Sequence, residues 1–133
     1  MFPPPSPWRQ VGAVDPDKHY VGFTSRFHLG SVRDLPGFVA ASRRIAKQVR
    51  TSPGLVGWSL AADLPKLEFH TLSAWEDEES LQTFLSTAPH SETMQRYGGR
   101  LRRTSIFVQF PVSGRELPLT WPDAVSRQIA SSQ

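Results

Sequence analysis

Apolar and polar residues alternate through residues 19–29, where Val21, Phe23, Phe27 and Leu29 are separated by more polar neighbours. A period of two is typical of a strand with one buried face. Over residues 34–50 the apolar positions instead repeat at intervals of three and four, which predicts an amphipathic helix. Its stripe consists of Leu35, Phe38, Val39, Ser42, Ile45, Ala46 and Val49. We expect Arg43, Arg44 and Lys47, which lie off this stripe, to face water.

Further along the chain, segments with the two-residue period of strands and segments with helical spacing follow one another. Residues 55–62 and 66–75 alternate on either side of a short turn, which predicts a β-hairpin. Helical spacing returns over residues 77–88 and again over residues 90–97, which end at a pair of glycines. Residues 101–112 read as the last strand. Thr120, Pro122 and Asp123 are start signals for a short terminal helix.

This order of elements is β-α-β-β-α-β, the ferredoxin-like arrangement of the α+β class. We divide the chain into a Pro-rich arm (residues 1–17), the ferredoxin-like domain (residues 18–113) and a tail with a short helix (residues 114–133). The arrangement places both main helices on one face of an antiparallel sheet, and we expect no helix on the other face. An apolar sheet face of this size does not stay in water, so we expect a homodimer.

Composition narrows the class of protein. A chain of 133 residues with 38% hydrophobic and 20% charged residues is typical of one soluble domain. Cysteine is absent, and no apolar run has the roughly 20 residues that a membrane-spanning helix needs. We therefore expect a cytoplasmic protein without a membrane segment. A net charge of +3, with no recognisable binding motif, does not indicate a nucleic-acid partner.

His90 is the strongest candidate for chemistry. It follows Pro89 at a helix start, shares a helix face with Met94 and Tyr97, and faces the same core as Phe84. An imidazole there could act as a general base, as a heme ligand or as a hydrogen-bond donor. It could also simply cap its helix and pack.

Two tryptophans could form the wall of a pocket for a flat aromatic ligand, namely Trp75 at the end of the third strand and Trp58 in the second. Trp75 could equally fill the corner between sheet and helix. Ser25 and Ser42 interrupt apolar stripes and could face a ligand. The histidines lack metal-site spacing, and no flavin or nicotinamide fingerprint is present.

The segment HTLSAWEDEESLQTFLSTAPHSETM resembles the strand–Trp–acidic helix–His signature of the antibiotic-biosynthesis-monooxygenase-like superfamily, the dimeric α+β barrels. The continuation SIFVQFPVSGRELPLTW is most similar to proteins related to spheroidene monooxygenase, which are thought to depend on heme. The resemblance covers residues 20–121. It implies a homodimeric barrel with a pocket between helices and sheet in each subunit.

Members of this superfamily include cofactor-independent oxygenases of polycyclic phenols and heme-degrading oxygenases. The heme-degrading members pair a helix histidine with a tryptophan and an asparagine. Phe84 stands where that tryptophan would lie, and the chain has no asparagine. The resemblance therefore implies an oxygenase for a hydrophobic or aromatic substrate, with His90 as base or as heme ligand. Trp58, Trp75, Phe84, Met94 and Tyr97 are its expected substrate-binding residues. A non-catalytic ligand-binding dimer and a non-oxidative isomerase or dehydratase using His90 are the alternatives.

Overall fold

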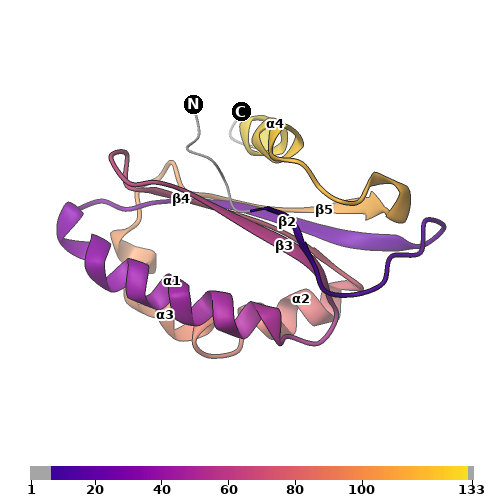
Figure 1. Ribbon diagram of the computed structural model, residues 1–133. Coiled ribbons are helices and arrows are strands. Elements are labelled where there is room, and N and C mark those ends of the chain that lie inside the picture. Colours follow the sequence, from indigo (N-terminus) through magenta and orange to yellow (C-terminus); the bar gives the residue numbers. More distant parts are fainter. Residues whose placement is uncertain (1–6, 132–133) are drawn as a thin grey trace.

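The alternating segments form one antiparallel sheet in the computed structural model, which describes residues 7–131 (Figure 1). Within that range the sheet has five strands in the order β1-β3-β4-β2-β5. The strands are β1 (Arg9–Gln10), β2 (His19–His28), β3 (Leu55–Asp63), β4 (Glu68–Trp75) and β5 (Ile106–Ser113). The ferredoxin-like α+β prediction is confirmed, and the hairpin of β3 and β4 pairs Asp63 with Glu68 beside the turn.

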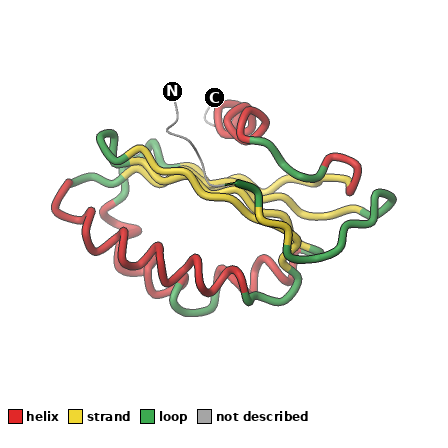
Figure 2. Tube along the Cα trace, in the orientation of Figure 1, coloured by secondary structure: helices red, strands yellow, loops and turns green. Residues whose placement is uncertain are grey.

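Helices cover the two faces of the sheet unequally (Figures 1 and 2). The helices α1 (Leu35–Arg50), α2 (Glu78–Leu85) and α3 (His90–Tyr97) lie on one face, and α4 (Trp121–Ser131) lies on the other. Short 3-10 helices occupy Val32–Asp34, Gly98–Arg100 and Gly114–Glu116. No helix within residues 7–131 has the length and apolar composition needed to cross a bilayer.

Local sequence signals explain where the helices begin and end. Pro36 occupies the first turn of α1, where its missing N–H costs no hydrogen bond. Gly54 follows α1 with φ +83°, in the left-handed region that favours glycine. The Asp77 carboxylate accepts a hydrogen bond from the Ser80 N–H at 2.7 Å and caps α2. α1 and α2 begin within one residue of their predicted starts.

Two segments differ from the prediction. The arm carries a short strand, β1, which pairs Arg9 with Trp58 and Gln10 with Gly57. Residues 1–6, most of the Pro-rich stretch, lie outside the described residues. The last strand begins at Ile106 instead of residue 101, because a 3-10 helix carries the chain on from α3 and Leu101 makes only an isolated bridge to Leu29.

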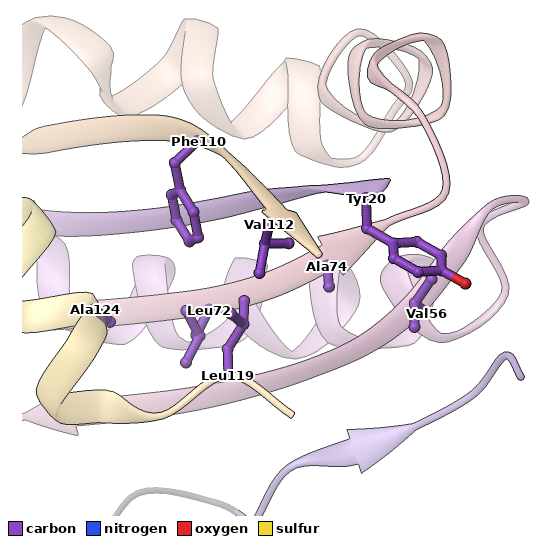
Figure 3. Close-up of a cluster of buried hydrophobic side chains, with 8 residues drawn as sticks. All are labelled: Tyr20, Val56, Leu72, Ala74, Phe110, Val112, Leu119 and Ala124. Carbon is purple, nitrogen blue, oxygen red and sulfur yellow. The ribbon is translucent and has the colours of Figure 1, made fainter. Parts of the chain in front are cut away.

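The sheet face opposite α1 is not bare. The tail after β5 turns back across the sheet, and Leu119 of the tail and Ala124 of α4 pack there against sheet residues. Figure 3 shows this buried cluster: Tyr20, Val56, Leu72, Ala74, Phe110, Val112, Leu119 and Ala124. Trp8 of the arm packs against the same cluster. The expectation that no helix covers this face was wrong, because the tail was long enough to supply one. The homodimer stays a prediction, but it can no longer be argued from an uncovered sheet face.

Polar contacts fix α4 in one position on the sheet. The Gln128 amide, 2% exposed, donates to the Thr24 hydroxyl at 3.0 Å, and the Trp121 indole donates to the Ser59 hydroxyl at 3.1 Å. The Arg127 guanidinium lies 3.9 Å from the centre of the Phe110 ring. Since a buried polar group is costly when its partner is lost, these contacts specify how the helix docks.

The Gln128→Ala substitution tests this docking. It removes a buried hydrogen bond and leaves a small void, so we expect the free energy of unfolding to fall by about 1–3 kcal/mol. Urea denaturation followed by circular dichroism measures the change. Ser126→Ala, at an exposed position of the same helix, is the matched control and should change stability by less than about 0.5 kcal/mol. Equal stability of the two variants would contradict a docked α4.

Candidate functional site

A cavity of about 420 Å³ lies between α1, α3 and the sheet. That volume is within the range of sites for small molecules. Its walls are mostly aromatic and aliphatic, with Phe23 and Phe27 from β2, Phe38 and Ile45 from α1, and Phe69 from β4. The cavity exists because α1 and α3 close over the sheet without filling the space beneath them with side chains.

The structure brings most of the predicted site residues to this cavity. Trp58, Phe84, His90 and Met94 line it, although they come from β3, α2 and α3. The two serines that interrupt apolar stripes, Ser25 and Ser42, also line it. The Ser25 and Thr71 hydroxyls hydrogen-bond to each other across neighbouring strands. The cavity is therefore apolar with a small number of polar groups.

Trp75 and Tyr97, which the sequence analysis placed on the wall, lie behind it. The Trp75 ring is fully buried, packs 5.2 Å from the Phe84 ring, and donates its N–H to the Ser73 hydroxyl at 2.9 Å. The Tyr97 ring packs edge-on against Phe38, with ring centres 5.3 Å apart. Both residues support the wall from the side away from the cavity.

Two hydrogen bonds position His90 at the start of α3. Its backbone N–H donates to the Gln48 side-chain oxygen at 3.0 Å, and its ring Nδ1 lies 3.0 Å from the Leu85 carbonyl oxygen. A carbonyl oxygen only accepts, so Nδ1 carries the proton and Nε2 of the neutral ring is left as an acceptor. The ring packs 5.0 Å from that of Phe84. His90 thus presents one basic nitrogen on a fixed imidazole.

Burial sets the charge of this imidazole. The His90 side chain is 9% exposed, and desolvation lowers its pKa below the ordinary 6.5, while the hydrogen bond to the Leu85 carbonyl partly opposes that shift. The ring is consequently neutral at pH 7. A neutral imidazole with a free Nε2 accepts a proton, as a general base must.

Trp58, which lines the same cavity, carries a hydrogen-bond donor. Its side chain is 6% exposed, and its indole N–H has no acceptor within the described part of the protein. A buried N–H without an acceptor costs about 1–3 kcal/mol. The group is therefore available to an oxygen atom of a bound ligand.

Two functional positions were missed or misplaced by the sequence analysis. The Gln48 amide donates to the Phe84 and Thr87 carbonyls at 3.3 and 3.1 Å while its oxygen accepts from His90. No pattern distinguishes this glutamine from a surface residue. Arg43, expected to face only water, is exposed but also lines the cavity.

The polar groups of the cavity decide what it could hold. Across residues 7–131 no three His, Asp or Glu side chains are grouped as a metal ion requires. His90 would supply an imidazole ligand to a heme, but heme carries two propionates and Arg43 is the one permanently charged residue on the described lining. The donor set therefore does not fit heme well.

Comparison with known proteins gives the fold. No family profile matches the sequence, and no curated protein matches it. Solved structures do match. SnoaB, a cofactor-independent oxygenase from Streptomyces nogalater, is 18% identical with a TM-score of 0.57, over 74% of this chain and 97% of SnoaB.

Two further solved structures agree. An antibiotic biosynthesis monooxygenase is 13% identical with a TM-score of 0.60, over 68% of this chain and 95% of its own. A dimeric ferredoxin-like protein of unknown function from Thermobifida fusca is 14% identical with a TM-score of 0.56, over 71% of this chain and 92% of its own. The closer likeness to the spheroidene monooxygenase branch stays a prediction. The fold of this chain is that of the antibiotic-biosynthesis-monooxygenase-like proteins.

Proposed function

We propose that the protein is a small oxygenase that acts on an aromatic substrate without a bound cofactor. The observation that carries the proposal is a neutral His90 with a free Nε2 on the wall of an apolar cavity. The shared fold with a cofactor-independent oxygenase supports it. The same site in a non-catalytic module would bind the ligand and leave it unchanged.

In this proposal His90 removes a proton from a phenol or from an activated ring methylene. The resulting anion is electron-rich enough to react with dioxygen. When a methylene becomes a carbonyl, one oxygen atom enters the product and the other leaves as water with the two hydrogens. The substrate therefore supplies all four electrons that dioxygen accepts, and no reductant is needed. Trp58 donates its N–H to the substrate oxygen, while Phe84 and Met94 hold the ring. Trp75 and Tyr97 contribute by supporting Phe84 and Phe38.

We further propose that two copies of the chain associate through β5. This strand forms an edge of the sheet, and Phe107 on it is 49% exposed although it packs on Phe27. The dimeric protein of the same fold supports an association of copies. Since α4 occupies the other face of the sheet, we place the association at this edge, where a strand of the partner could pair with β5.

The His90→Gln substitution tests the proton transfer. It keeps a side chain of similar size and removes the base, so we expect the rate of oxygen consumption with anthrone as a test substrate to fall about 10²–10⁴-fold. Anthrone binding, followed by tryptophan fluorescence, should be retained. His28→Gln, on the other face of β2, is the matched control and should keep the wild-type rate. Binding without oxygen consumption in the wild type would indicate the ligand-binding module instead.

The lowered pKa of His90 also predicts how stability depends on pH. The unfolded chain binds a proton near pH 6.5, whereas folded His90 binds it only at lower pH. Stability is therefore full above about pH 7 and falls as the pH drops through this window. His70, whose pKa burial also lowers, contributes in the same direction. Urea denaturation at pH 7 and pH 5 should show a smaller loss in His90→Gln than in the wild type. An identical loss would mean that folded His90 titrates normally.

Light scattering after gel filtration tests the association. We expect twice the mass of one chain for the wild type and a shift toward the mass of one chain for Phe107→Glu, because a charge opposes burial of this strand edge. Leu64→Glu introduces the same charge at another exposed apolar residue, in the β3–β4 turn, and should leave the mass unchanged. A wild-type chain that stays single at all concentrations would contradict the dimer.

A further inference from the structure

Arg43 differs from the other described residues that line the cavity. It is the one lining residue exposed to solvent, and it is the one that carries a permanent charge. His90 is buried and has a lowered pKa, and the His70 ring packs against Trp121 of α4 on the other face of the sheet. The lining of the cavity therefore reaches the protein surface at a guanidinium group, where we place its opening, and its interior is uncharged at neutral pH.

Nothing in the surrounding sequence neutralises this charge. Between Asp34 and Asp63 the chain contains no acidic residue, while α1 carries Arg43, Arg44, Lys47 and Arg50. Within residues 7–131, the Arg43 side chain forms no ion pair or hydrogen bond. The exposed side of α1 is consequently a positively charged rim.

The sheet side of the cavity offers no competing charge near water. The partly exposed lining residues of β3 include Leu60 and Ala62, and both are apolar. An anionic group at the opening would therefore meet Arg43 and no carboxylate on the described lining. A cationic group would meet only repulsion from α1.

The distance from this charge to the proposed base limits the size of a ligand. Gln48, which hydrogen-bonds to the His90 backbone, lies five positions after Arg43 on the same helix. At 1.5 Å per residue, the two positions are about 7.5 Å apart along the helix axis. Two or three fused rings span a gap of this order between a group at the opening and a group at His90.

We propose that the cavity takes an aromatic carboxylate with an ionisable hydroxyl group at its far end, and that Arg43 selects the carboxylate. The apolar walls hold the rings, the guanidinium fork matches a carboxylate at the opening, and the hydroxyl lies at His90. The hydroxyl end of this inference rests on the proposed function. The carboxylate end rests on Arg43 alone.

Binding of two related probes tests the selection. The protein is titrated with a hydroxynaphthoic acid and with naphthol, which lacks the carboxylate. The fluorescence of Trp58 and the other tryptophans reports binding. We expect the wild type to bind the acid about 3–10-fold more tightly than naphthol, and Arg43→Gln to lose that preference while binding naphthol as before. The preference should shrink as salt is added.

Arg44→Gln is the matched control, since it removes an equal charge from the next position of α1 and Arg44 does not line the cavity. It should keep the preference for the acid. Equal binding of the two probes by the wild type, or an equal loss in the two variants, would overturn the inference. His90→Gln should still prefer the acid. An unchanged preference in Arg43→Gln alongside His90-dependent oxygen consumption would overturn the inference and leave the proposed function intact.

Discussion

The Gln48 side chain joins the first helix to the junction of the second and third, and the candidate site depends on that link. Its amide donates to two carbonyls at the end of α2, and its oxygen accepts the first N–H of α3. Both carbonyls also accept a backbone N–H, from Thr87 and Ser91, so the amide adds a second donor to each, while the Gln48 oxygen accepts the N–H of His90 at the start of α3. The same contacts orient His90 toward the cavity.

The two faces of the sheet are covered in different ways. On the α4 side, apolar residues pack closely and polar contacts set the position of the helix. On the α1 side, Trp75 and Phe84 pack closely near α2, and the space nearer the middle of α1 remains a cavity. A fold that closes one face by itself and leaves room under the other has the arrangement that a small-molecule site needs.

The sequence predicted the strands and helices whose alternation is regular, including α3 with both its ends. It also predicted His90, Trp58, Phe84 and Met94 at one place, because each lies on the apolar face of its element. The sequence analysis failed for features whose position depends on tertiary contacts. The docking of α4 depends on how the tail turns after β5, and Tyr97 and Trp75 lie one layer deeper than their helical and strand phases indicate. The role of Gln48 depends on three backbone groups that only the folded chain brings together.

Nitrogen-15 NMR of the His90 ring tests the central claim most directly, because it reports which ring nitrogen carries the proton and at what pH the second proton binds. The account predicts a proton on Nδ1, a pKa below the ordinary value of about 6.5, and a shift of the Nε2 signal when naphthol is added. A proton on Nε2, or a pKa at or above that of a free histidine, would contradict it.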